Sequence, residues 1–495
     1  METRKEIDSL GIKKVPKDAY YGIQTVRAVE NFPVSDYKAP AGFIKSYVYI
    51  KKTAALTNMK VGWLDKQIGR AIVKTCDEVL DGRFMEQFVV DVFQAGAGTS
   101  FNMNVNEVLA NRALEILGKE KGDYRSISPN DHVNMAQSSN DTFPTALHVS
   151  VLLAMRQLLP ELERLSNAFG ALSTKHAGVI KSGRTHLQDA PPVTLGQEFG
   201  AYATTIRACR KQLEARSKLL LEVALGGTAT GTGVNAHPKF RSTAIADLSK
   251  MTGLKLTPAK DPFEALQSRR AITAVSSGLK ELALELVRIA NDLRLLSSGP
   301  TTGLAEISLP AVQPGSSIMP GKVNPVMAEC LNMIAFQMVG NDLTVSLAVQ
   351  AGQLELNVMT PVMMHNVLQS IQILTNYLPV FTKKCVEGIT ADEKRCSSYV
   401  EKNPSLAVFL SAHIGYLEAS KIAKQALKVG RSVKEVAVEK GLLTAGQAER
   451  IFGPESLLGK DREKEKAQHG RQGGTARTPR TKRKTSRAIG PPQNT

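Results

Sequence analysis

The stretch RRAITAVSSGLKELALELVRIANDLRLLSS, residues 269–298, carries the clearest structural pattern in the sequence. Its apolar residues are separated alternately by three and four positions, which gives a continuous apolar seam typical of helices in a bundle. The seam is formed by Ile272, Val275, Leu279, Leu282, Leu286, Ile289, Leu293 and Leu296. Residues 326–350 repeat the pattern more weakly. The sequence therefore predicts a bundle of long helices, and such helices often also join subunits.

Composition supports a large helical core. Hydrophobic residues make up 42% of the 495 residues but aromatic residues only 5%, and a core rich in Ala, Leu, Val and Met suits helix packing. No apolar run reaches the roughly 18 residues that a membrane span needs, and the charged N-terminus lacks a secretory signal. The five cysteines show no metal-binding or disulfide spacing. We therefore expect a cytoplasmic protein without a metal or cofactor.

Positive charge is concentrated at the C-terminal end. The net charge is +17, and from Arg471 onward there are seven basic and no acidic residues. With almost no apolar residues, the segment 459–495 is predicted to be a basic disordered tail. Such a tail could bind nucleic acid or an acidic partner, which is a different class of function. It has no aromatic residues between the basic ones, which argues against a platform that stacks bases.

A loop rich in glycine and proline precedes the second helical stretch. It reads Gly315-Ser-Ser-Ile-Met-Pro-Gly-Lys-Val-Asn-Pro325, and its glycines and prolines exclude a regular helix. Ser316 and Ser317 offer hydroxyl and backbone N–H groups. Lys322 supplies a charge suited to a carboxylate, and Asn324 supplies both a donor and an acceptor. Polar groups on a loop held between long helices are a common arrangement for a binding site.

Two further polar stretches each precede a predicted helix. In residues 94–107, small residues lead to Thr99, so a glycine-rich turn would point backbone N–H groups at an anion. An ordinary helix cap explains Thr99 equally well. In residues 132–144 the hydrogen-bonding side chains are Ser138, Ser139 and Asn140. Asp141 follows them, and we expect it to orient the turn because it would repel an anionic substrate.

A third polar turn lies at residues 182–190, where Thr185 and His186 are neighbours. A single histidine is more often structural than catalytic. The hydroxyl beside it and its position in a loop nevertheless make His186 a candidate.

The loop 315–325 resembles the signature of the fumarase/aspartase superfamily, G-S-S-x-M-P-x-K-x-N-P, at every specified position. The stretches at 96–107 and 183–190 match the family patterns G-x-G-T-S-x-N-M-N-x-N-E and G-R-T-x-x-Q-D-A, and residues 20–33 resemble its N-terminal motif. The resemblance covers roughly residues 15–455. It implies a mainly α, three-domain fold whose central helix bundle forms the core of a homotetramer. The expected boundaries are a mixed N-terminal domain at 1–140, the bundle at 141–396 and a small helical domain at 397–458.

The resemblance also implies a chemistry. Ser316 would act as the base that removes a proton next to a carboxylate of a small dicarboxylate, giving an aci-carboxylate intermediate. In this family each site is assembled from three subunits. The resemblance implies that the α-carboxylate is held by Lys322 and Asn324. It implies that the β-carboxylate is held by Thr99, Ser138, Ser139 and Ser317. The leaving group would be faced by Asn140 and His186, with Thr185 nearby.

The leaving group separates the two main branches of the superfamily. Residues 22–25, 186–188 and 355–361 are similar to the aspartase branch, which eliminates ammonia from aspartate. Residues 138–144 and 226–228 look more like the fumarase branch, which eliminates water from malate. We expect the aspartase activity, with fumarate hydratase as the alternative. Thr301 departs from the usual family arginine, and Ser411-Ala-His413 departs from the usual Asn-Pro-His or Asn-Pro-Tyr.

Overall fold

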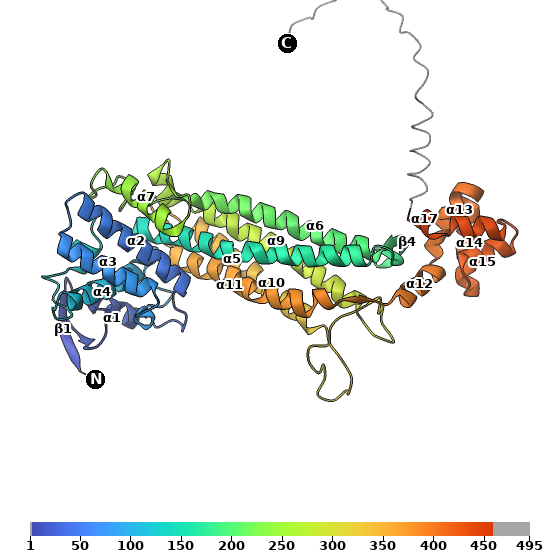
Figure 1. The fold of residues 1–495 in the computed structure, drawn as a ribbon, viewed down its shortest axis with the longest axis horizontal. Coiled ribbons are helices and arrows are strands. Elements are labelled where there is room, and N and C mark those ends of the chain that lie inside the picture. The colour runs from blue at the N-terminus through green and yellow to red at the C-terminus, as the bar shows by residue number, and fades with distance from the viewer. Residues whose placement is uncertain (1, 459–495) are drawn as a thin grey trace, which may run out of the picture. The chain divides into compact units, whose positions relative to one another are not determined.

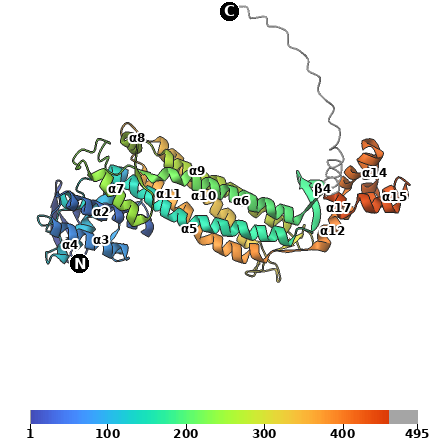
Figure 2. The ribbon, with the colours of Figure 1, turned by 45° about the horizontal axis from the view of Figure 1, so that its top comes forward.

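Long helices dominate the computed structural model, which describes residues 2–458 and confirms the predicted mainly α fold (Figure 1). The longest of them run side by side as a bundle in both ribbon views (Figure 1, Figure 2). They are α5 (Ser139–Lys175), α6 (Leu195–Ser217), α9 (Arg270–Leu296), α10 (Val326–Gln350) and α11 (Thr360–Lys384).

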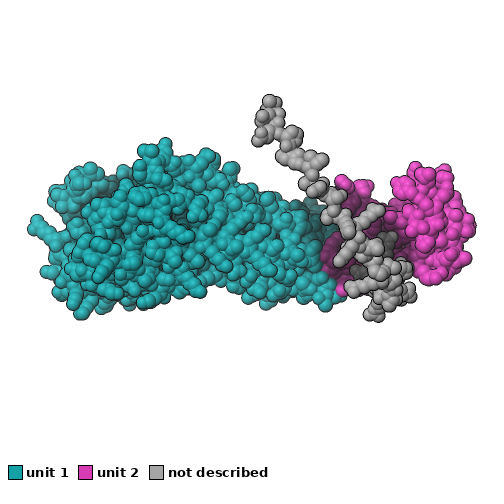
Figure 3. Space-filling model, turned by 90° about the horizontal axis from the view of Figure 1, so that it is seen from above, with its two compact units in different colours: residues 1–175, 199–391 teal, residues 176–198, 392–495 magenta. Residues whose placement is uncertain are grey.

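Contacts within the chain define two compact units, which Figure 3 shows in different colours. Among the described residues, unit 1 comprises 2–175 and 199–391, and unit 2 comprises 176–198 and 392–458. Unit 2 therefore takes a segment from the middle of the sequence. The division into three domains remains a prediction, and the predicted tail at 459–495 lies outside the described residues.

The bundle core in unit 1 is built on the apolar seam of α9. Helix α9 packs against α10, α10 against α11, and α11 against α5. All eight seam residues of α9 are buried, with no more than 6% of any one exposed. The weaker α10 pattern also faces inward, because Leu331, Met338 and Val345 are buried. The spacing of apolar residues thus positions the helices that carry the polar loops.

The N-terminal part of unit 1 begins with an antiparallel hairpin of β1 (Thr3–Asp8) and β2 (Gly11–Pro16). The sequence predicted a mixed N-terminal domain but not this hairpin, and residues 20–33, which resemble the family's N-terminal motif, contain α1 (Ile23–Asn31). Buried Glu107 fixes the start of α1, since its carboxylate accepts hydrogen bonds from the N–H groups of Gly22, Gln24 and Thr25 at 2.8–3.1 Å. These bonds satisfy donors that a helix start leaves unpaired.

The remaining α-helices and strands of unit 1 lie outside this bundle (Figure 1). They are α2 (Ala41–Lys60), α3 (Lys66–Leu80), α4 (Thr99–Ile116), a π-helical turn (Pro129–Val133), α7 (Phe240–Thr252) and α8 (Pro262–Gln267), with the short strands β5 (Glu222–Val223), β6 (Thr257–Pro258), β7 (Ile307–Ser308) and β8 (Thr390–Ala391). Helices α2, α3 and α4 lie with α1 at one end of the bundle (Figure 1). Strand β5 pairs with β6 in parallel, and β7 with β8 in antiparallel orientation. In the part of the chain that is described, no helix is long and apolar enough to cross a membrane.

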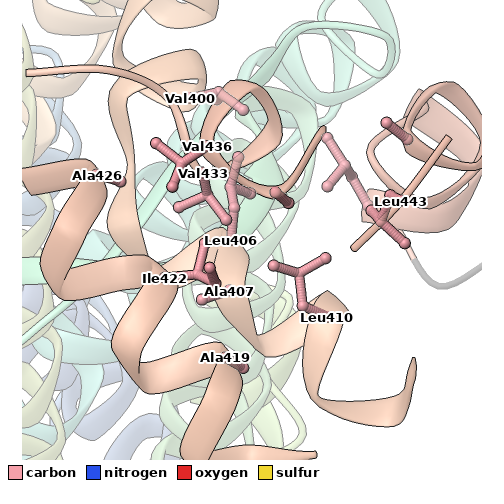
Figure 4. Close-up of a cluster of buried hydrophobic side chains, with 13 residues drawn as sticks. Val400, Leu406, Ala407, Leu410, Ala419, Ile422, Ala426, Val433, Val436 and Leu443 are labelled. Carbon is pink, nitrogen blue, oxygen red and sulfur yellow. The ribbon is translucent and has the colours of Figure 1, made fainter. Parts of the chain in front are cut away.

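Unit 2 combines a second hairpin with a small helical core. The hairpin pairs β3 (Ile180–Thr185) with β4 (Gln188–Thr194). Its helices are α12 (Glu393–Lys402), α13 (Ala407–Ile414), α14 (Tyr416–Val429), α15 (Val433–Glu439), α16 (Ala445–Ile451) and α17 (Pro454–Leu457). Their apolar side chains, among them Leu410, Ile422 and Val436, form one buried cluster (Figure 4). The sequence predicted only a turn at residues 182–190 and did not predict this hairpin.

Candidate active site

Two helix starts bring Thr99 and Ser139 together. Thr99 begins α4 and Ser139 begins α5, and their hydroxyl oxygens lie 3.1 Å apart. Gly98 permits this approach: it has a φ of 71°, and a Cβ there would lie 1.9 Å from the ring of Phe143. Helix starts carry positive dipole ends and unpaired N–H groups, so two of them side by side suit an anion. We call Thr99, Ser138, Ser139 and Asn140 the Thr99 cluster.

Asp141 orients this cluster through hydrogen bonds to backbone N–H groups. It is fully buried, and one carboxylate oxygen accepts the N–H of Ser138 at 3.0 Å. The other oxygen accepts the N–H groups of Gly226 and Thr228 at 2.9 and 3.0 Å. Burial raises the pKa of Asp141 to about 6, while the three N–H donors oppose that rise. Asn140 contacts the same turn, because its side-chain amide donates to the carbonyl of Ala229 at 2.8 Å. Asp141 thus positions the turn, as the sequence suggested.

A buried lysine behind the cluster was not recognised from the sequence. Lys51 of α2 is fully buried and donates to the side-chain oxygens of Asn102 and Asn134 at 2.8 and 3.0 Å. Burial lowers the pKa of Lys51 to about 7, and the charge of Asp141 opposes that shift. The only sequence signal was a lysine at a core-facing position of an apolar helix. Its contacts fix side chains from α4 and from the turn before α5.

The second group of candidates lies on the loop 315–325, which is closed at its base. The N–H of Gly315 donates to the carbonyl of Lys322 at 2.8 Å, and the side-chain amide of Asn324 donates to the carbonyl of Gly315. The ammonium group of Lys322 donates to the Asn324 side-chain oxygen at 2.8 Å. Lys322 and Asn324 therefore stand together, as a pair that holds one carboxylate would require.

Ser316 occupies a distinctive position on this loop. Its hydroxyl oxygen accepts the backbone N–H groups of Ile318 and Met319 at 3.2 and 3.0 Å. Ser317 is exposed. Two N–H groups directed at one oxygen stabilise negative charge on it, which a serine needs before it can act as a base. The side chain of Ile318 is 83% exposed, so the loop presents apolar as well as polar groups to its surroundings.

Thr185 and His186 belong to unit 2, whereas the other eight candidates belong to unit 1. They lie at the tip of the β3–β4 hairpin, where Thr185 pairs with Gln188 across a two-residue turn. His186 and Leu187 both have positive φ angles, 56° and 59°, as a type I′ turn requires. The turn leaves His186 exposed.

The Thr99 cluster and the loop 315–325 lie at opposite ends of α11. Near the start of α11, the carbonyl of Val358 accepts the N–H of Ala97, two residues before Thr99. Near its end, the hydroxyl of Tyr377 donates to the carbonyl of Met327, just after the loop. From Thr360 to Tyr377 a helix rises by about 25 Å. Figure 1 likewise shows the chain between α9 and α10 leaving the bundle at the end away from α1–α4. Within one chain, the two groups are apart.

A cavity of about 980 Å³ opens beside Thr99. It is lined by Thr99 and Ser100, by Arg27, and by Arg125 and Asn130 from the segment that precedes α5. None of the other nine candidate residues lines it. Arg27 is engaged by Asp8, whose carboxylate accepts two of its N–H groups at 2.8 and 2.9 Å. The cavity is therefore a polar space next to the Thr99 cluster, not the meeting point of the candidates.

Hydroxyl groups at helix starts and a lysine–asparagine loop on a long-helix bundle suit the binding of a carboxylate. The family model described as lyase matches residues 11–340, and the one described as fumarase C C-terminus matches residues 406–459. The chain belongs to this lyase family, the fumarase/aspartase superfamily that its motifs indicated.

Individual relatives agree with this membership. An aspartate ammonia-lyase from a Bacillus species is 51% identical over 92% of this chain and 97% of its own length. A solved fumarate lyase:delta crystallin from Brucella melitensis is 50% identical, with a TM-score of 0.88 over 92% of this chain and 99% of that one. A class II fumarase from Schistosoma mansoni is 38% identical, with a TM-score of 0.89 over 92% and 98%.

Proposed function

We propose that this protein is an aspartate ammonia-lyase, which converts L-aspartate reversibly to fumarate and ammonia. The observation that carries the proposal is the environment of Ser316, whose hydroxyl oxygen accepts two backbone N–H groups on the family's signature loop. The names of relatives at about half sequence identity, such as the Bacillus enzyme, support ammonia as the leaving group.

In the proposed reaction the Ser316 alkoxide takes a proton from the carbon next to the β-carboxylate. The electron pair moves onto the β-carboxylate oxygens, where hydroxyl and N–H donors stabilise the aci-carboxylate. The charge then returns to form the carbon–carbon double bond, and the bond to the amino group breaks. Lys322 and Asn324 hold the α-carboxylate, and Ser317 with Thr99, Ser138 and Ser139 holds the β-carboxylate. Asn140 and His186 face the departing amine, with Thr185 beside them.

The geometry of one chain supports a site shared between subunits. Ser316 and Thr99 lie at opposite ends of α11, so they meet only if different subunits supply them. Helix α10 also exposes apolar side chains along one face, which is unusual for a surface that stays in water. These side chains are Met333, Phe336, Leu343 and Leu347. We therefore propose a homotetramer that packs through the bundle and builds each site from several subunits.

The choice of substrate can be tested directly. Purified protein is incubated with L-aspartate or with L-malate, fumarate is followed by ultraviolet absorbance, and ammonia is measured in parallel. We expect fumarate and ammonia in equal amounts from L-aspartate. Fumarate from L-malate with none from L-aspartate would replace the proposal with fumarate hydratase. A mock purification from cells that do not express the protein serves as control, because any fumarate that it forms comes from a contaminating enzyme.

A further inference from the structure

Arg269, directly before α9, is a buried cation with part of its guanidinium group unpaired. Only 3% of the residue is exposed. One terminal nitrogen, Nη1, donates to the carbonyls of Ala265 and Ser268 at 2.6 and 3.2 Å. The other two, Nε and Nη2, have no hydrogen-bond partner among residues 2–458. A buried charge with unsatisfied donors is costly unless something pairs with it.

Arg269 lines a small cavity of about 30 Å³. Pro144 and His148 of α5 line it together with Ala224, Ala259 and Ala271, the last of which belongs to the first turn of α9. This volume admits one particle of about the size of a water molecule or a monatomic ion. It is far too small for a dicarboxylate, so the cavity is not a second substrate site.

The start of α9 adds positive potential to the same cavity. The helix is 27 residues long, and its N-cap residue Arg269 makes no side-chain cap bond. The N–H of Arg270 donates to the Ser268 hydroxyl at 3.3 Å, which leaves the N–H groups of Ala271 and Ile272 uncapped. Unpaired N–H groups and the helix dipole both favour an anion there. The buried Arg269 and the first residues of α9 therefore line one cavity, and both favour a negative charge in it.

The charge of Glu264 partly offsets the effect of burial on the pKa of Arg269, but among residues 2–458 no carboxylate is hydrogen-bonded to the guanidinium group. Glu264 is engaged by Arg270, whose Nε lies 2.9 Å from its carboxylate. Glu222 lies 4.0 Å from the ammonium group of Lys260. His148 is uncharged at neutral pH because burial lowers its pKa to about 4, and its Nδ1 faces the carbonyls of Leu220 and Glu222. Burial lowers the pKa of Arg269 to about 10, so Arg269 remains charged at neutral pH.

We propose that this cavity binds one small monovalent anion, a halide such as chloride, between Arg269 and the first turn of α9. The anion pairs with Nε and Nη2 and ties the start of α9 to α5. It does not touch the candidate residues, so its role is to stabilise the junction of α5, α8 and α9. The inference goes beyond the proposed function and holds whichever substrate the enzyme uses.

The test compares thermal unfolding of the full-length protein in sodium chloride and in sodium gluconate at equal ionic strength, since gluconate is too large for the cavity. A ligand that binds only the folded state raises Tm with its concentration, here by roughly 1–3 °C for each tenfold increase above Kd. We expect this rise in chloride, but not in gluconate. The Arg269→Gln variant should lose the chloride effect, and the Arg164→Gln variant, altered at a side chain of α5 that is 57% exposed and does not line the cavity, should keep it.

A second measurement covers the case in which Arg269→Gln fails to fold. Crystals of the unmodified protein grown in bromide should show an anomalous peak within hydrogen-bond distance of Nε and Nη2 of Arg269. Equal Tm values in chloride and gluconate, without a bromide peak, would overturn the proposal and leave water or the Glu264 side chain as the partner of Arg269. A chloride effect that persists in a folded Arg269→Gln variant would overturn it as well.

Discussion

The Ser316→Ala variant is expected to lose roughly 10²–10⁴-fold in kcat for L-aspartate, which is the usual contribution of a positioned general base. The hydroxyl oxygen of Ser316 accepts N–H groups from Ile318 and Met319, so the alkoxide is stabilised where the proton must be taken. Alanine keeps the loop backbone but removes the atom that receives the proton. Initial rates of fumarate formation at saturating aspartate measure the effect.

Ser242→Ala is a suitable control for this variant. Ser242 is exposed on α7, and its hydroxyl bonds only to the carbonyl of Lys239 at 3.3 Å. The control should retain full activity. If Ser316→Ala kept a near-normal kcat with its circular dichroism spectrum and oligomer mass unchanged, another group would have to be the base.

The Lys322→Met variant should raise KM for L-aspartate by roughly 10- to 100-fold, because a hydrogen bond to a charged group contributes about 1.5–3 kcal/mol. Lys322 is exposed and held beside Asn324, so its charge is available to a carboxylate that enters from solvent. The expected loss falls mainly on substrate binding. Lys260→Met, at a side chain that is 91% exposed, controls for the loss of one positive charge. An unchanged KM in Lys322→Met would remove Lys322 from the site.

The bundle could be predicted from the sequence because one physical signal runs through it. The seam of α9 alternates spacings of three and four over its whole length, and burial of one helix face produces that pattern directly. The two hairpins were missed for the opposite reason. Strand β1 reads TRKEID and β4 reads QDAPPVT, and neither shows the alternation of apolar and polar residues that marks a half-buried strand.

The candidate residues could be found from the sequence, but their arrangement could not. The motifs identified Thr99, Ser139 and Ser316, yet the contact between Thr99 and Ser139 joins helix starts 40 residues apart. The separation of Ser316 from both depends on which end of α11 each segment reaches. Arg269 belongs to no motif that the sequence shows. That its Nε and Nη2 are buried without a partner among the described residues can be recognised only once the surrounding side chains are placed.

The central proposal is that different subunits supply Ser316 and Thr99 to one site. Co-expression of two inactive variants tests this proposal most directly. Ser316→Ala and Thr99→Val chains carry different affinity tags, and tandem purification keeps only mixed oligomers. If the site is shared, random mixing restores about a quarter of the wild-type activity, since some sites receive both intact residues. If both residues come from the same chain, mixed oligomers should be no more active than either parent, and that result would contradict the account.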